Sequence, residues 1–262
     1  MHLEQVTRKV IEIAKEAGAF IREQRKTFSP DKIEIKGLND LVSYVDKTAE
    51  QMIVAALEQV FPEAGFITEE KTINKTGERF NWIIDPLDGT TNFIHGLPVY
   101  SVSIALQEYN QLVSGVVYEI NQDECFYAWQ GSPAYLNGNE IKVSHSQTID
   151  KSLLATGFPY YDFSKQPAYI CLFTELMKSC HGLRRLGSAA VDLAYTACGR
   201  FDGYYEYNLN PWDVAAGILI VRQAGGDVVN FKGGDECLNT RELLATNGKI
   251  TAELLETIQK HF

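Results

Sequence analysis

The chain has 262 residues and a formal net charge of -10, and its hydrophobic and charged contents of 45% and 22% are ordinary for a soluble globular protein. The acidic charge disfavours a nucleic-acid backbone or an anionic membrane as the principal partner, and no apolar run reaches membrane-spanning length. The five cysteines are scattered without a C-x-x-C pair, and the first residues mix charged with apolar side chains. We therefore expect a cytoplasmic protein with reduced thiols and without a signal peptide, a disulfide framework or a zinc site.

The first part of the chain, up to about residue 150, predicts two helices followed by strands. Apolar residues recur at helical spacing between Val6 and Ile21, so the first helix should end before Pro30. A second helix is expected at 49–60, ended by Pro62. The remaining apolar segments are short and separated by turns, which is typical of strands. Two strands are expected at 65–68 and 82–84, and an antiparallel meander follows at 101–106, 113–118, 125–129 and 140–143.

After about residue 150 the pattern changes to an alternation of strands and helices. Strands are expected at 153–156, 202–206, 228–231 and 243–246, and helices at 169–177, 189–198, 212–224 and 252–259. The sequence has no internal repeat, linker or low-complexity tract. A meander followed by strand–helix alternation predicts a layered architecture that mixes α and β elements.

The most informative segment is Trp-Ile-Ile-Asp-Pro-Leu-Asp-Gly-Thr-Thr-Asn-Phe at 82–93. An apolar strand is expected to end at Asp85, and the turn that follows carries a second acid, Asp88. Two carboxylates about 4 Å apart repel by roughly 4 kcal/mol at an effective dielectric constant near 20. A divalent cation held by oxygen ligands would offset this repulsion, whereas a solvated turn is the simpler alternative.

The residues after Asp88 add a second kind of chemistry. Gly89, Thr90 and Thr91 are positioned to open a helix, where free backbone N–H groups suit a phosphate. Glycine lets the backbone approach an anion closely. Ordinary capping of the helix by a threonine is the alternative, and the two roles are compatible.

Three other acidic positions have both a structural and a functional interpretation. Asp213 follows Asn210-Pro211, so it either stabilises the start of a helix or binds a metal ion. Glu69 follows a predicted strand and is either solvated or a further oxygen ligand. Asp46 precedes the second helix and suits N-terminal capping. Ser188 has neither a nearby histidine nor a G-x-S-x-G context, which disfavours nucleophilic serine catalysis.

Taken together, these segments resemble the inositol monophosphatase family. The segment 82–93 and the sequence Asn-Pro-Trp-Asp-Val-Ala-Ala-Gly at 210–217 are similar to the two signatures of that family. The resemblance runs essentially the length of the chain and includes 36–46, 66–70, 156–159 and 184–190. The chain departs from the family pattern at 160–163, Tyr-Tyr-Asp-Phe, on the substrate side.

The resemblance implies a role for each motif residue. The metal ligands would be four carboxylates and one backbone carbonyl, which hold two or three Mg²⁺ ions: Glu69, Asp85, Asp88, Asp213 and the carbonyl of Leu87. Thr90 paired with Asp46 would orient and deprotonate the attacking water, and Glu69 would also belong to the catalytic set. Phosphate would be held by Gly89, Thr90 and Thr91. The substrate's hydroxyl groups would be bound by Glu206, with Gly187, Ser188 and Ala189 lining the same pocket.

The resemblance also implies the fold and the activity. The fold would be α+β, a layered αβαβα sandwich forming a single catalytic unit over 1–262. Most metal ligands would lie in the half 1–150, and Asp213 and the substrate pocket in the half 151–262. The expected activity is Mg²⁺-dependent hydrolysis of inositol monophosphate by a lithium-sensitive homodimer.

Other substrates and roles remain open on the same scaffold. The enzyme alternatives are phosphatases for 3′(2′),5′-bisphosphate nucleotides, histidinol phosphate or fructose 1,6-bisphosphate. The sequence Thr91-Asn92-Phe93 favours inositol phosphate over the nucleotide and histidinol substrates, whose phosphatases tend to have Asp-Gly-Thr-Lys or a similar variant. A regulatory binding protein is the alternative from a different functional class.

Overall fold

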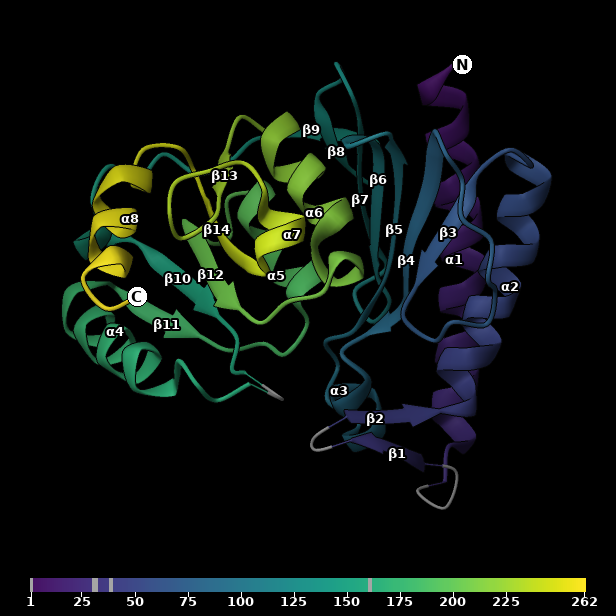
Figure 1. Ribbon diagram of the computed structural model, residues 1–262, viewed down its shortest axis with the longest axis horizontal. Helices are drawn as coiled ribbons and strands as arrows, with labels where there is room; N and C mark the ends of the chain where they lie inside the picture. Colours follow the sequence, from purple (N-terminus) through teal and green to yellow (C-terminus); the bar gives the residue numbers. More distant parts are fainter. Residues whose placement is uncertain (1, 30–32, 38–39, 160–161) are drawn as a thin grey trace.

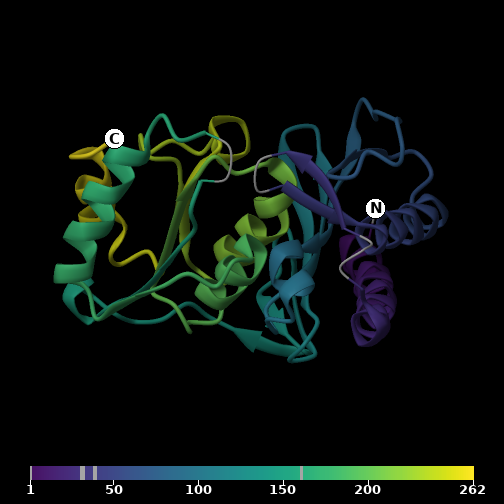
Figure 2. The same ribbon diagram turned by 90° about the horizontal axis from the view of Figure 1, so that it is seen from below.

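The computed structural model describes residues 2–29, 33–37, 40–159 and 162–262, and within 33–42 it describes the backbone alone. The chain forms five layers (Figures 1 and 2). The helices α1 (Leu3–Thr27) and α2 (Tyr44–Val60) form the first layer. A seven-stranded sheet, the helix pair α5 (Ala189–Ala197) and α6 (Pro211–Gln223), a five-stranded sheet, and the pair α4 (Gln166–Ser179) and α8 (Thr251–Gln259) follow in order. The predicted αβαβα sandwich is confirmed.

The seven-stranded sheet has the strand order β3-β4-β5-β6-β7-β8-β9. Strands β3 and β4 pair in parallel, and every later neighbour pairs antiparallel, as the predicted meander requires. The strand bounds are β3 (Gly65–Thr68), β4 (Phe80–Asp88), β5 (Ser101–Glu108), β6 (Gln111–Glu119), β7 (Glu124–Trp129), β8 (Ala134–Leu136) and β9 (Asn139–Ile141).

The five-stranded sheet has the strand order β11-β10-β12-β14-β13 and is mixed. Strand β10 pairs in parallel with both β11 and β12, and β14 pairs antiparallel with β12 and β13. The strand bounds are β10 (Leu153–Thr156), β11 (Gly182–Arg184), β12 (Gly203–Tyr207), β13 (Asp227–Val229) and β14 (Glu242–Thr246). Smaller elements are the hairpin of β1 (Ile33–Gly37) and β2 (Asp40–Ser43), the short helices α3 (Thr90–His95) and α7 (Cys237–Thr240), and a 3₁₀ turn at Ile149–Lys151.

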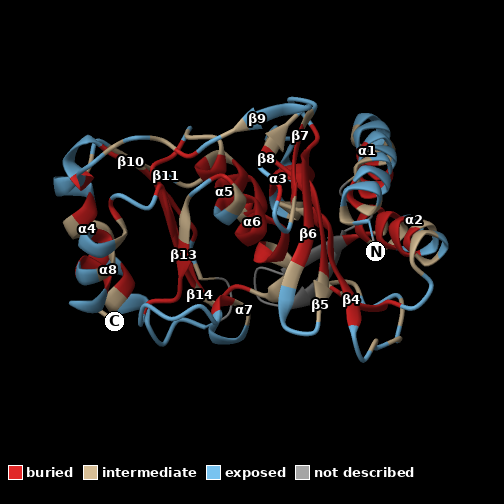
Figure 3. Ribbon diagram, turned by 90° about the horizontal axis from the view of Figure 1, so that it is seen from above, coloured by how far each residue is buried: buried red, intermediate tan, exposed pale blue. Residues whose placement is uncertain are grey.

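Helix α6 explains why the central layer holds together. It lies between the two sheets, and its residues 214–221 are all buried, so it has no polar face along that stretch (Figure 3). A helix that is apolar all round is stable in water only when other elements cover every side. Gly115 of β6 lets α6 approach closely, because a Cβ atom there would stand 2.8 Å from the carbonyl oxygen of Ala216.

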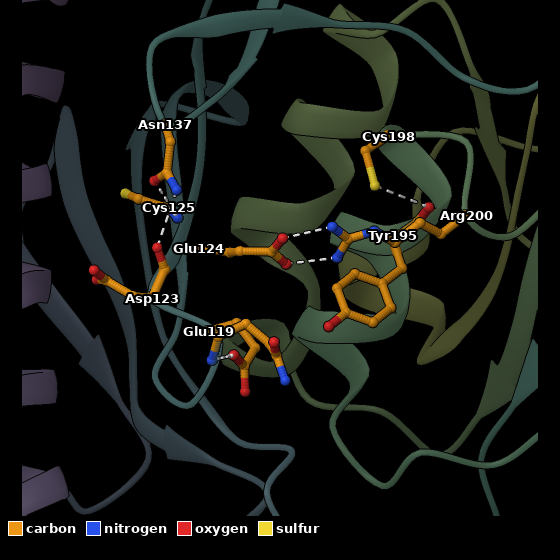
Figure 4. Close-up of polar contacts among 9 residues, drawn as sticks. Glu119, Asp123, Glu124, Cys125, Asn137, Tyr195, Cys198 and Arg200 are labelled. Carbon is orange, nitrogen blue, oxygen red and sulfur yellow. Dashed lines mark hydrogen bonds and ion pairs between the residues drawn. The ribbon is translucent and has the colours of Figure 1, made fainter.

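A bidentate ion pair joins the meander to the central helices on the side shown in Figure 4. The guanidinium of Arg200, just after α5, donates to both carboxylate oxygens of Glu124 at the start of β7. The same guanidinium lies 4.5 Å from the ring centroid of Tyr195, which adds a cation–π contact.

The differences from the sequence expectations are local. Strand β4 continues to Asp88, whereas the sequence predicted a turn after Asp85. Strands β8 and β11 and helix α7 were not predicted, because elements of three or four residues are too short to show a period. Among the described residues no helix is long and apolar enough to cross a membrane.

Candidate active site

A pocket lies where the ends of β4 and β12 meet the starts of α3, α5 and α6. All the predicted site residues line it except Asp46, which lies behind Thr90. Its lining consists of Glu69, Asp85, Leu87, Asp88, Gly89, Thr90, Thr91, Gly157, Arg185, Gly187, Ser188, Ala189, Asp192, Glu206, Asn208, Leu209, Asn210 and Asp213. Residues that are distant in the sequence, from 46 to 213, are therefore brought together.

An irregularity in β4 places Asp85 and Asp88 on the same face of the sheet. Side chains alternate between faces along a strand, so two residues three positions apart should face opposite ways. Asp85 pairs with Ser103 and Asp88 with Ser101, which leaves one extra residue on β4. Ile83 packs in the core between the sheets, whereas Leu87 packs with the core under α1 and α2. The alternation thus reverses between 83 and 87, and both carboxylates face the pocket.

Asp85 is buried, at 3% exposure, more deeply than Glu69, Asp88 and Asp213. Its Oδ1 atom accepts a hydrogen bond of 3.0 Å from the N–H of Leu87. Burial and the neighbouring carboxylates of Glu69 and Asp88 raise the pKa of Asp85 well above its ordinary value. Burial and the charge of Asp213 do the same for the pKa of Glu69. The site therefore concentrates negative charge that the fold itself does not neutralise.

Asp88 links the two halves of the chain at the pocket. Its Oδ2 atom accepts hydrogen bonds from the hydroxyl of Ser188 at 2.6 Å and from the N–H of Ala190 at 2.7 Å. Burial raises the pKa of Asp88 to about 6, although these two donors act in the opposite direction. Ser188, predicted to be no nucleophile, is the N-cap residue of α5 and accepts a hydrogen bond from the N–H of Val191.

Asp213 combines the two interpretations that the sequence left open. It lies in the first turn of α6, and its Oδ2 atom accepts a hydrogen bond of 2.7 Å from the N–H of Asn210. That contact stabilises the helix start, as capping predicts. The same side chain lines the pocket, where burial raises its pKa to about 7. One oxygen of Asp213 thus caps the start of α6, while the carboxylate lines the same pocket as Asp85 and Asp88.

Glu50, which the sequence did not single out, shapes the turn that carries Glu69. It is fully buried in α2 and accepts hydrogen bonds from the N–H groups of Glu70 and Thr72 at 2.7 and 2.8 Å. The hydroxyl of Thr72 donates to it as well, at 2.7 Å. A buried carboxylate satisfied by three donors fixes the backbone around it. Its only sequence signal was an acid on the apolar face of a predicted helix.

Thr90 and Asp46 form a pair at the entrance to α3. The hydroxyl of Thr90 lies 2.8 Å from Oδ1 of Asp46 and 3.0 Å from the carbonyl oxygen of Leu87. The Oδ2 atom of Asp46 accepts from the N–H and hydroxyl of Ser43, the N-cap residue of α2, at 2.9 and 2.7 Å. Burial raises the pKa of Asp46. Gly89, with φ of 97°, makes the turn that aims Thr90 at this acid.

Glu206 lies on the opposite side of the pocket, at the end of β12. It is 8% exposed, and the hydroxyl of Tyr204 donates to its Oε2 atom at 2.5 Å. Gly157 makes room for it, because a Cβ atom at that position would stand 1.8 Å from the same oxygen. Burial raises the pKa of Glu206 to about 8. Of the departure from the family pattern at 160–163, residues 160 and 161 lie outside the described residues.

The donors in the pocket fit a hard cation. Glu69, Asp85, Asp88 and Asp213 offer oxygen atoms only, and the carbonyl of Leu87 lies beside Thr90. Within the part of the chain that the structure describes, no three acidic, histidine or cysteine side chains converge as a ready-made cage. Such openness is compatible with Mg²⁺, which keeps several water ligands.

Six pocket residues were missed as site residues by the sequence analysis: Gly157, Arg185, Asp192, Asn208, Leu209 and Asn210. Arg185 was visible within a family motif, but nothing in the sequence placed its charge near the acids. In the structure it lowers the pKa of Asp88 and of Glu206.

Comparison with known proteins agrees with this geometry. Residues 2–262 match the model of the inositol monophosphatase family. The protein named Nus factor SuhB from Escherichia coli (strain K12) is 41% identical over 252 residues, which cover 95% of this chain and 94% of that protein. Inositol-1-monophosphatase from Mesorhizobium japonicum is 36% identical, covering 96% and 95%. The structure of inositol monophosphatase from Anabaena (Nostoc) sp. PCC 7120 has 35% identity and a TM-score of 0.87, covering 100% and 98%.

Proposed function

Because the chain belongs to the inositol monophosphatase family, we propose that it is a Mg²⁺-dependent phosphatase that hydrolyses inositol monophosphate to inositol and phosphate. One observation carries the proposal: four carboxylates, the Thr90–Asp46 pair and Glu206 surround a single pocket. Each of these groups meets one requirement of phosphate monoester hydrolysis. A site that only binds a ligand would not require all of them in one pocket.

The acids Glu69, Asp85, Asp88 and Asp213, with the carbonyl of Leu87, would hold the metal. Two or three bound Mg²⁺ ions would neutralise the dianionic ester and lower the pKa of water. A net charge of -10 makes this local reversal of sign necessary, since the protein otherwise repels a phosphate. The high pKa values of Asp85 and Glu69 have the same origin as metal affinity, which is buried negative charge without a counter-charge.

Thr90 and Asp46 would handle the proton of the attacking water. The hydroxyl of Thr90 already donates to Asp46, so its lone pairs are directed away from that acid. A water that donates to Thr90 would lose its proton to the Thr90 oxygen as the Thr90 proton moves to Asp46. Asp46 suits this role because burial raises its pKa. Glu69, on the same side of the pocket, would complete the catalytic set.

The remaining pocket residues would bind the two ends of the substrate. The backbone N–H groups of Gly89, Thr90 and Thr91 would hold the phosphate, as the positive φ of Gly89 permits. Glu206 would accept hydrogen bonds from the inositol hydroxyls, beside Gly187, Ser188 and Ala189. Assembly as a homodimer and inhibition by lithium remain predictions from the family.

The test is a panel of phosphate monoesters assayed with and without Mg²⁺. We expect the highest kcat/KM for inositol monophosphate, and no turnover in EDTA. A higher value for a bisphosphate nucleotide, histidinol phosphate or fructose 1,6-bisphosphate would assign another substrate. Asp88→Asn should abolish hydrolysis, and Asp235→Asn, at a position whose side chain is 90% exposed, serves as the matched control.

A second candidate is a role that does not depend on catalysis. Its support is the name of two relatives, Nus factor SuhB from Escherichia coli and putative Nus factor SuhB from Neisseria meningitidis, at 41% and 39% identity. Replacing the chromosomal copy with the Asp88→Asn variant separates the two roles. Normal growth of a strain that needs this protein would favour the second candidate, and loss of growth would favour the phosphatase.

A further inference from the structure

Asp192 is a buried acid in the pocket that the catalytic roles leave unused. It lies in α5, lines the pocket and is 1% exposed. Its Oδ1 atom has no hydrogen-bond partner among the described residues. A buried polar atom without a hydrogen-bond partner destabilises the fold, so such atoms are rare in native proteins and call for an explanation.

The position of Asp192 in its helix does not supply that reason. The helix dipole favours an acid near a helix N-terminus, but this gain is smaller than the usual cost of burying the acid unpaired. Ser188 already caps α5 by accepting the N–H of Val191. The N–H of Asp192 itself donates to the carbonyl of Ser188. The first turn of α5 is therefore hydrogen-bonded without any contribution from the Asp192 side chain.

The neighbours of Asp192 show which part of the pocket it serves. Asp192 shares the pocket lining with Glu206, Asp88 and Arg185. Burial raises the pKa of Asp192, the charges of Glu206 and Asp88 raise it further, and the charge of Arg185 acts in the opposite direction. The hydroxyl of Tyr204 donates to Glu206, and no corresponding protein donor reaches Asp192 Oδ1 within the described structure. A second polar atom in this lining, Nδ2 of Asn208, also lacks a partner there.

We propose that Asp192 is a substrate-recognition residue that accepts a hydrogen bond from a hydroxyl group of the leaving alcohol, in addition to the hydroxyl bound by Glu206. This inference rests on the phosphatase function proposed above and narrows its substrate class. The alcohol must carry hydroxyl groups that reach both acids, so cyclic polyol phosphates are preferred to esters with a single hydroxyl or none. A hydroxyl supplies the donor that Asp192 lacks in the free protein.

The test compares two esters that share a ring and differ in hydroxyl groups: myo-inositol 1-phosphate and cyclohexyl phosphate, both with Mg²⁺. Asp192→Leu, which has no acceptor, should lower kcat/KM for inositol phosphate about tenfold or more, mainly through KM. Asp192→Asn keeps one acceptor oxygen and should lose less. Hydrolysis of cyclohexyl phosphate should be unchanged in both. Because both variants remove a carboxylate with one unpaired buried oxygen, their Tm should equal or exceed that of the wild type.

Thr196→Val is the matched control, since Thr196 is buried in the same helix and does not line the pocket. It should leave the ratio of the two kcat/KM values unchanged. An equal loss for both esters in Asp192→Leu would overturn the inference, and so would a lower Tm with an unchanged ratio. Failure of the wild type to hydrolyse either ester would instead overturn the phosphatase function itself.

Discussion

The hydroxyl of Thr90 lies 2.8 Å from a carboxylate oxygen of Asp46, although 44 positions separate the two residues in the sequence. The contact joins the first turns of α2 and α3. Asp46 therefore has two structural tasks, because its other oxygen accepts from Ser43 at the start of α2. Of the two, Thr90 can be changed with less effect on the fold.

Thr90→Val should lower kcat by about 10²–10⁴-fold, the usual contribution of a positioned acid–base group, with a small change in KM. Valine keeps the shape of threonine and removes only the hydroxyl. Steady-state assays at saturating Mg²⁺ measure the effect. Thr240→Val, at an exposed position in α7, is the control and should be fully active. A kcat within twofold of the wild type would refute the role given to Thr90.

Glu50→Gln should weaken Mg²⁺ binding, although Glu50 itself does not line the pocket. Glutamine replaces one of the two carboxylate oxygens with an NH₂ group, so either the N–H of Glu70 or the N–H and hydroxyl of Thr72 would face a donor instead of an acceptor. The turn that carries Glu69 would therefore shift. Changes to groups that orient metal ligands commonly cost 10–100-fold in affinity, about the size we expect for the half-saturating Mg²⁺ concentration. Glu58→Gln, on an exposed part of the same helix, is the control. Equal Mg²⁺ requirements for the two variants would contradict the prediction.

The metal-free protein should become less stable as the pH rises. The pKa values of Asp88 and Asp213 in the fold are about 6 and about 7, against 3.8 for an ordinary aspartate. The folded chain therefore binds more protons than the unfolded chain between about pH 4 and pH 7, so the free energy of unfolding falls across that window. In EDTA the Tm should be lower at pH 8 than at pH 5. Mg²⁺ should diminish this difference, because it binds the ionised acids.

The double variant Asp88→Asn/Asp213→Asn identifies the source of that pH dependence. In EDTA it should show a smaller fall of Tm between pH 5 and pH 8 than the wild type does. An identical fall would place the responsible groups elsewhere in the protein.

Arg200→Ala should lower the free energy of unfolding by about 1 kcal/mol, since a partly exposed ion pair with a cation–π contact contributes little more. The side chain is 40% exposed and its partner Glu124 17% (Figure 4). A double-mutant cycle with Glu124→Gln measures the coupling, which should weaken in high salt. The KM for substrate should not change, because neither residue lines the pocket. A coupling energy near zero would show that the pair does not hold the two halves together.

Most of the fold was predictable because apolar residues recur along its long helices and strands at the spacing typical of each. Helices α1, α2, α6 and α8 and the strands of the meander were all expected near their observed bounds. Strand β4 was predicted too short, because alternation of apolar residues cannot reveal that Asp85 and Asp88 still pair with β5. Short strands such as β11 depend on neighbours in space rather than on their own sequence.

Only site residues that belong to continuous sequence motifs could be predicted from the residues themselves. Segment 82–93 and the start of α6 identified Asp85, Asp88 and Asp213. Glu69 and Asp46 were visible as acids beside predicted elements, but the family resemblance supplied their roles, and it alone supplied Glu206. Glu50 and Asp192 escaped because each looks like an ordinary helix residue in the sequence. Both residues are buried in the folded chain. Glu50 has hydrogen-bond partners there, whereas Oδ1 of Asp192 lacks one, and neither fact can be read from the sequence.

The extra residue in β4 makes the pocket sensitive to the length of this strand as well as to its composition. Deleting Pro86 would let β4 pair with β5 in unbroken register, and the strand itself would survive. The acid now at 88 would then follow Asp85 by two positions and would still share its face, because side chains two apart on a regular strand point the same way. What would change is the backbone between the two acids, which carries the carbonyl of Leu87 and its contact with the hydroxyl of Thr90. The length of this segment therefore matters for the carbonyl and for Thr90 rather than for the face that the two acids share.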